Sequence, residues 1–115
     1  MPSLSHLAAA AEAELPAAEP KPTSLTGQSE ATLELWAEGD ASAGVWECGP
    51  GTFTAVRDGI HEVCQVLAGR ATLVGEDGQR VEVAGGSTIV LPDGWKGTWE
   101  IHETLRKTYV IIPTR

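Results

Sequence analysis

The chain has little positive charge. Eight Lys and Arg residues stand against sixteen Asp and Glu residues, so the 115-residue chain carries a formal net charge of −8 at pH 7. Arg106-Lys107 is its one pair of adjacent basic residues. Nucleic-acid binding depends on clustered Lys and Arg that neutralise phosphates. The composition therefore argues against a nucleic-acid partner and predicts an acidic, solvated surface.

Long apolar runs and numerous cysteines are also missing. No stretch approaches the roughly 20 apolar residues that a membrane-spanning helix needs, and no secretory signal pattern is present. The two cysteines are Cys48 and Cys64. We therefore expect no membrane partner, a cytoplasmic location and two free thiols. A disulfide between the two requires that their strands be neighbours.

A helix signal is confined to the N-terminal part. Residues 5–15 are rich in Ala, Glu and Leu, which are strong helix formers, and Pro16 stops the pattern. The Ala/Glu/Pro-rich composition that continues beyond it is also typical of mobile chain. The sequence predicts an N-terminal arm over residues 1–30, either a short helix or disordered, followed by one domain over residues 31–115.

From Thr32 onward, apolar and polar residues alternate with a period of two. Short alternating segments are separated by Gly, Pro and Asp-Gly turn signals, and the chain has thirteen glycines and seven prolines. Such spacing is typical of an all-β sandwich or barrel. The predicted strands cover residues 32–36, 44–48, 52–56, 62–67, 71–74, 80–83, 88–91, 97–101 and 108–112.

Two spacings within these strands resemble a known family. Glu62 stands seven residues before the turn glycine Gly69, and Gly86 is followed after five residues by the turn Pro92-Asp93-Gly94. Residues from about 32 to 112 therefore resemble the cupin superfamily, and within it the small single-domain group related to ureidoglycine aminohydrolase and the ethanolamine-utilisation cupin. The resemblance implies a cupin double-stranded β-helix, which is a jelly-roll-like barrel, and a homodimer that exchanges the arm or an edge strand.

The histidines that bind metal in cupins are absent. Cupins have His-x-His shortly before the glutamate and a further histidine after the second motif. Here those positions hold Val56 and Asp58, or Ala55 and Arg57, in the first motif and Gly97 in the second. One glutamate does not hold a transition metal against water, so we expect no cofactor. A divalent metal held by Glu62, Cys64 and Asp58 is the alternative, and the three histidines, His6, His61 and His102, are expected at exposed or interfacial positions.

The alternation also predicts which side chains face the barrel interior. Cys64 shares the facing of Glu62, and Trp99 shares that of Gly97. An indole beside a glycine can form the wall of a pocket for a flat or apolar ligand. The predicted ligand pocket consists of Glu62, Cys64, Trp46, Gly97 and Trp99, and no catalytic residue is assigned.

Each of these residues also has a structural interpretation. Glu62 is either open to a pocket or a buried group paired with Lys107, Arg106 or Tyr109. Cys64 is expected to be an inert buried thiol. Three functions follow: a metal-independent small-molecule-binding protein, which we favour; an enzyme resembling ureidoglycine aminohydrolase that acts on a small nitrogenous metabolite; and a filled-barrel structural or interaction subunit.

Overall fold

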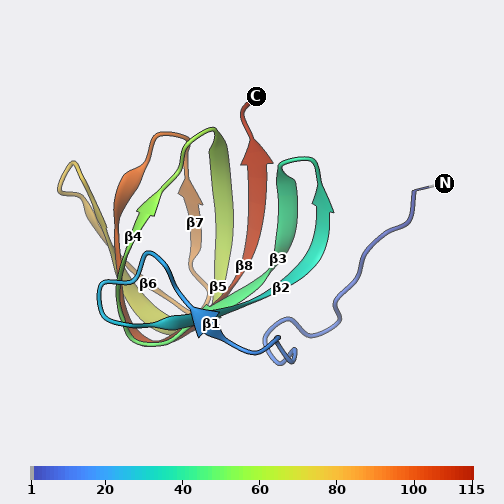
Figure 1. Cartoon of the computed structure of the whole chain (residues 1–115), viewed down its shortest axis with the longest axis horizontal. Coiled ribbons are helices and arrows are strands. Elements are labelled where there is room, and N and C mark those ends of the chain that lie inside the picture. Colours follow the sequence, from blue (N-terminus) through green and yellow to red (C-terminus); the bar gives the residue numbers. More distant parts are fainter. Residues whose placement is uncertain (1) are drawn as a thin grey trace.

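The computed structural model describes residues 2–115; Met1, the first residue of the predicted arm, lies outside this range. The described residues form an all-β fold (Figure 1). They contain no helix that could cross a membrane. The strands are β1 (Glu19–Pro20), β2 (Ser29–Glu38), β3 (Ala41–Cys48), β4 (Gly51–Val56), β5 (Ile60–Gly75), β6 (Arg80–Ala84), β7 (Thr88–Leu91) and β8 (Lys96–Pro113).

Two long strands, β5 and β8, run through both walls of the barrel. They pair antiparallel from Ile60 opposite Pro113 to Gly75 opposite Gly97. Their ends near Ile60 belong to a wall ordered β1-β2-β3-β8-β5-β7, whereas their ends near Gly75 belong to a wall ordered β4-β8-β5-β6. All pairings are antiparallel, and the predicted jelly-roll-like cupin barrel is confirmed.

The predicted turn at Gly69 is wrong, because the chain continues there as a single strand. Predicted segments 62–67 and 71–74 are both parts of β5, whose register with β8 shifts three times between Val66 and Ala71. A glycine with positive φ can form a β-bulge that bends a strand without reversing it. Gly69 has a φ of 91°, and a Cβ atom there would lie 2.2 Å from the carbonyl oxygen of Thr104. In the same way, predicted segments 97–101 and 108–112 are both parts of β8.

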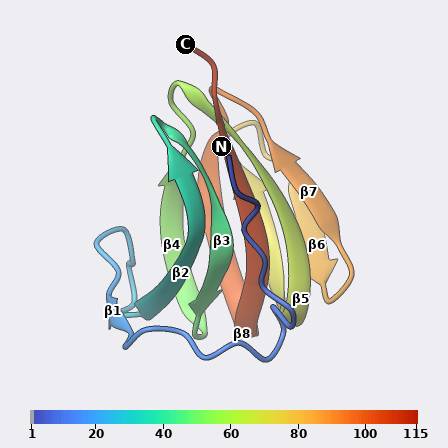
Figure 2. The same ribbon diagram turned by 90° about the vertical axis from the view of Figure 1, so that its right-hand side faces the viewer.

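The predicted N-terminal helix is not present. Residues 2–18 form an irregular arm with one turn, in which the N–H of Glu12 donates to the carbonyl of Ala9 at 3.1 Å. The Arg106 guanidinium donates to the carbonyls of Ala10 and Ala13 at 3.0 and 2.8 Å, which takes up acceptors that a helix would use. A helix of this length is marginal in water without packing. The arm crosses in front of β8 in Figure 2.

Buried apolar side chains fill most of the space between the two walls. The ring of Phe53 is stacked on Trp99 at a centroid distance of 5.9 Å and meets the edge of Trp46 at 5.8 Å. Cys48 and Cys64 are buried free thiols on β3 and β5, which β8 separates, so no disulfide joins them. The core residues are Trp46, Cys48, Phe53, Ala55, Val66, Ala71, Leu73, Val83, Leu91, Trp99, Ile101 and Leu105.

Candidate functional site

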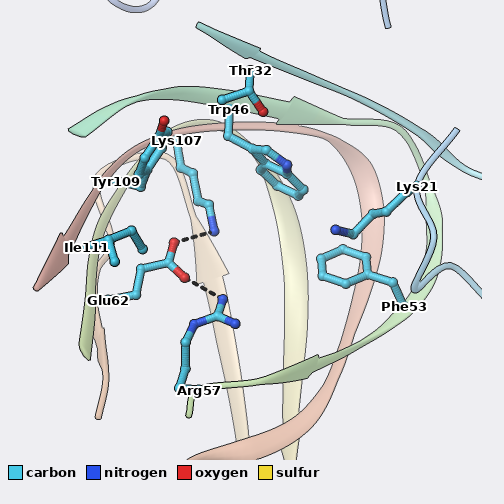
Figure 3. A pocket seen from close by; sticks show the side chains of 9 residues that line it. All are labelled: Lys21, Thr32, Trp46, Phe53, Arg57, Glu62, Lys107, Tyr109 and Ile111. Carbon is cyan, nitrogen blue, oxygen red and sulfur yellow. Dashed lines mark hydrogen bonds and ion pairs between the residues drawn. The ribbon is translucent and has the colours of Figure 1, made fainter. Parts of the chain in front are cut away.

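A charged cluster centred on Glu62 lies inside the barrel, where an apolar core would be expected (Figure 3). Alternation along β5 turns Glu62 inward, and the residue is only 4 % exposed. Lys107 on β8 places its ammonium 2.9 Å from one carboxylate oxygen of Glu62, and the guanidinium of Arg57 binds the other oxygen. The Cys64 thiol donates a further hydrogen bond to Glu62 at 2.9 Å. The pairing with Lys107 is one that the sequence predicts, whereas Arg106 instead pairs with Glu47 on the outer face.

The two cations keep Glu62 ionised. Burial by itself would raise the pKa of Glu62, but the charges of Lys107 and Arg57 and the hydrogen bonds from Cys64 and Lys107 outweigh it and lower the pKa to about 2. For Cys64 the effect of burial is not outweighed, and the pKa of the thiol rises to about 12. Cys64 is therefore a neutral hydrogen-bond donor rather than a nucleophile.

The turn predicted at Pro92-Asp93-Gly94 holds Arg57 in place. Arg57 follows directly after β4, where its N–H donates to the carbonyl of Trp95 at 2.9 Å and its own carbonyl accepts from the N–H of Gly94 at 2.7 Å. Asp93 ties the same region to Gly59, whose N–H donates to the Asp93 carboxylate at 2.8 Å. The turn thus identifies the fold and also fixes the backbone from which Arg57 reaches Glu62.

Aromatic rings lie beside the ammonium groups. The Nζ atom of Lys107 lies 4.6 Å from the ring centroid of Trp46 and 4.5 Å from that of Trp99. The Nζ atom of Lys21, which follows β1, lies 4.4 Å from the ring of Phe53. These distances are typical of cation–π contacts. Glu30 ties the group together, because it accepts hydrogen bonds from Lys21 at 3.0 Å and from the indole N–H of Trp46 at 2.8 Å.

A cavity of about 190 Å³ opens between these side chains. Figure 3 shows the charged ends of Lys21, Arg57, Glu62 and Lys107 directed toward a common space, with the rings of Trp46 and Phe53 beside it. The walls come from both sides of the barrel and from the segment after β1. The lining residues are Lys21, Thr32, Trp46, Phe53, Arg57, Glu62, Lys107, Tyr109 and Ile111.

Two of the five predicted pocket residues, Glu62 and Trp46, line this cavity. Cys64 lies behind Glu62 and is 1 % exposed, while Trp99 is fully buried beneath Lys107 and Phe53. Gly97 does not line the cavity. A Cβ atom there would lie 2.2 Å from the carbonyl oxygen of Val74 and 2.8 Å from the ring of Trp95. The glycine therefore permits the close approach of β5 and of a neighbouring indole, and it leaves no space for a ligand.

Five residues that line the cavity were not expected there from the sequence: Lys21, Thr32, Phe53, Arg57 and Ile111. Arg57 stands at one of the four positions, in two alternative pairs, where a histidine of the first cupin motif would be expected, and that coincidence was the available signal. Alternation along β8 places Tyr109 and Ile111 on the same face as Lys107. Lys21 and Phe53 had no comparable signal, because the path of the segment after β1 brings the lysine to the ring.

The residues around Glu62 do not fit a divalent metal. Asp58, which would complete the alternative site, is exposed and 3.7 Å from Arg115. Across residues 2–115 there is no group of three or more His, Cys, Asp or Glu side chains arranged to hold a metal ion. Arg57 and Lys107 would repel a second cation at Glu62. His61 and His102 are occupied elsewhere, by hydrogen bonds with the Asp93 N–H and with Thr72.

A match between the sequence and a family model identifies the family of this chain. Residues 35–109 match the family model described as the EutQ-like cupin domain. The chain is an EutQ-like cupin. The resemblance to the ethanolamine-utilisation cupin is thereby confirmed, over nearly the same residues. No functionally curated protein matches the sequence.

Solved structures similar to this EutQ-like cupin share its fold at low identity. A putative EutQ from Salmonella typhimurium is 20% identical with a TM-score of 0.66, covering 76% of this chain and 72% of that one. EutQ of Clostridium difficile is 21% identical with a TM-score of 0.70, covering 83% and 76%. A protein of unknown function from Pseudomonas syringae is 23% identical with a TM-score of 0.77, covering 88% and 45%. These relatives support the fold and assign no activity to this chain.

Proposed function

We propose that this EutQ-like cupin binds a small organic molecule in its barrel cavity without the help of a metal ion. The observation that carries the proposal is the pairing of a cavity with a fixed charge cluster. Glu62, which stands at the metal-ligand position of the family, is held by Lys107 and Arg57. These two cations supply the positive charge that a metal would bring. Apolar walls with a few converging polar groups are typical of small-molecule sites.

The two alternative functions are less well supported. A filled-barrel subunit would have no space at the charge cluster, whereas a cavity of about 190 Å³ lies there. Trp99, which is stacked on Phe53 and fully buried, does fill the barrel next to the cavity. The expectation of a filled barrel therefore holds for that part of the interior. An enzyme resembling ureidoglycine aminohydrolase would use a metal in the barrel, and the carboxylate available for it is already bound by Lys107 and Arg57.

A thermal-shift screen tests the proposal. Metal-free protein is heated with small acids, amines and amides, each at the highest soluble concentration. A ligand at a hundred times its Kd adds about 2.7 kcal/mol to the free energy of unfolding, which raises Tm by about 10 °C for a domain of this size. We expect at least one class of compound to raise Tm.

A matched pair of variants ties any shift to the cavity. Thr32→Trp places an indole into the cavity from β2, whereas Thr104→Trp places one at an exposed position of β8. We expect the shift to be lost in Thr32→Trp and kept in Thr104→Trp. A screen without any shift, or a shift that survives in Thr32→Trp, contradicts the proposed function.

We also propose that two copies of the chain associate through the outer face of the first wall. The register places Trp36, Ala43, Val110, Val63 and Val90 side by side across β2, β3, β8, β5 and β7. Trp36, Val110 and Val90 are 42, 42 and 58 % exposed. In a chain with a net charge of −8, an uncharged strip is where two copies can meet with the least repulsion. Sedimentation of the intact chain as a monomer at all concentrations would contradict this association.

A further inference from the structure

The cavity of this acidic protein is positively charged. Three cations, Lys21, Arg57 and Lys107, line it, and Glu62 is the one carboxylate among the lining residues. Glu30, which binds Lys21, adds a second negative charge at its edge. The sum over these five side chains is therefore +1, although the whole chain carries −8. Clefts whose local charge opposes the overall charge concentrate ligands of the opposite sign.

Hydrogen-bond donors also outnumber acceptors in the cavity. An ammonium group has three N–H donors and a guanidinium has five. Within the described chain, Lys107 and Lys21 each donate one side-chain hydrogen bond, to Glu62 and Glu30. Arg57 donates to Glu62 and to the carbonyl of Val56 through its two terminal nitrogens, which leaves one further N–H on each of them. Both oxygens of Glu62 are already taken, so the free capacity of the site is for accepting groups on a ligand.

The rest of the cavity suits a flat apolar body. Trp46, Phe53, Tyr109 and Ile111 supply rings and an aliphatic side chain to its walls. The volume of about 190 Å³ exceeds the roughly 150 Å³ of an engineered apolar cavity that binds benzene in another protein. A six-membered ring with one small substituent is therefore the size that the space accepts.

A carboxylate near Tyr109 bears on the charge of the ligand. Glu34 on β2 lies opposite Gly44, which is paired with Tyr109. Burial, and then the charges of Glu34 and Glu62, raise the pKa of Tyr109. The phenol therefore stays neutral and able to donate, while a second negative charge on a ligand beside Tyr109 would be repelled by Glu34.

We infer that the ligand of this cavity is a small organic monoacid, whose carboxylate is held by Lys21, Arg57 and Lys107 and whose flat apolar part lies against Trp46 and Phe53. This inference rests on the proposed function and names its ligand class. Neutral and cationic molecules of the same shape are rejected, because they leave the free donors unpaired or bring a fourth positive charge to the site.

Three compounds of one shape test the charge preference. Benzoate, benzamide and benzylamine are titrated into the intact, chelator-treated protein and followed by tryptophan fluorescence and calorimetry. We expect benzoate to bind about tenfold or more tightly than benzamide, because it adds charge-assisted hydrogen bonds, and benzylamine not to bind. Terephthalate, which carries a second carboxylate at the far end of the ring, is expected to bind more weakly than benzoate.

A substitution at the edge of the cluster keeps the test independent of folding. Lys21→Met removes one cation without stripping a partner from Glu62, and its partner Glu30 keeps the hydrogen bond from Trp46. We expect Lys21→Met to lose most of the benzoate affinity, Lys21→Arg to keep it, and the exposed Lys96→Met, away from the cavity, to behave as wild type.

The outcomes separate the two proposals. Equal binding of benzoate and benzamide, or tighter binding of benzylamine, overturns the monoacid inference and leaves small-molecule binding in place. Benzoate affinity that is unchanged in Lys21→Met also overturns the inference. Absence of binding by all three compounds overturns the inference too, and absence of any hit in the broader thermal-shift screen overturns the proposed function itself.

Discussion

One barrel wall carries a buried charge cluster on its inner face and a row of exposed apolar side chains on its outer face. On β8, Lys107 faces inward and is 5 % exposed, whereas Val110, three residues later, faces outward and is 42 % exposed. On β5 the charged Glu62 is buried, and the neighbouring Val63, on the opposite face, is half-buried. Buried charges are costly unless they are paired, and exposed apolar rows are uncommon in monomers. The proposed small-molecule site rests on the inner feature, and the proposed association of two chains rests on the outer one.

The largest change in the free energy of unfolding is expected from removing one cation of the buried charge cluster. Lys107→Met leaves Glu62 buried with a single cation, and removing one partner of a buried ion pair costs about 3–5 kcal/mol. We expect this variant to be strongly destabilised or unfolded in chemical denaturation. The double variant Lys107→Met/Glu62→Gln removes the stranded charge and is expected to recover much of the loss. A single variant as stable as wild type would show that the cluster is not a buried, coupled unit.

The second-largest effect is expected from acid, which should lower the free energy of unfolding by protonating Glu62. The pKa of Glu62 falls from an ordinary 4.5 to about 2 in the folded chain. The stabilisation from this group is therefore complete above pH 4.5 and is lost as the pH falls from there toward 2, by up to about 3 kcal/mol. Denaturation curves measured across this range should show a decline that is shallower in Glu62→Gln. Identical slopes for the two proteins would contradict the assignment of this decline to Glu62.

A change on the outer face should leave folding nearly untouched. Val110→Glu introduces a charge at an exposed position, and such substitutions alter the free energy of unfolding by about 0.5 kcal/mol or less. We expect sedimentation analysis to show monomers where the unmodified chain forms dimers. Thr108→Glu, on the same face of β8 beyond the apolar row, is the matched control. A variant that stays dimeric would move the association surface elsewhere.

The smallest effect is expected from metal removal. Because Lys107 and Arg57 already neutralise Glu62, a chelator should change Tm by less than about 1 °C, and so should added Mn²⁺ or Zn²⁺. Elemental analysis of the purified protein measures its metal content independently of Tm. A stoichiometric metal, or a large fall in Tm on chelation, would contradict the proposed metal independence.

The sequence was informative wherever local spacing decides the structure. The distances from Glu62 to Gly69 and from Gly86 to Gly94 identified the cupin barrel, and strand alternation correctly turned Glu62 and Trp99 inward. Lys107 was one of three partners expected for a buried Glu62, with Arg106 and Tyr109 as the others. These features depend on which face of a strand a residue occupies, and that face can be read from the order of residues.

The remaining features depend on contacts between distant segments. Gly69 was expected to reverse the chain, yet a positive φ also suits a bulge, and only the pairing with β8 distinguishes the two. Trp95 filled the space at Gly97 because the turn before β8 folds its indole over that residue. Residues 5–15 had helix propensity, but Arg106 binds the carbonyls of Ala10 and Ala13. Propensity and spacing do not report such competition.

The central claim is that fixed cations of the chain replace a metal in holding the ligand. Titration of benzoate into chelator-treated protein, with tryptophan fluorescence as the signal, tests it most directly, because Trp46 lines the cavity. We expect saturable one-to-one binding with the same Kd before and after chelation. Binding that disappears on chelation and returns only with a divalent metal would contradict it.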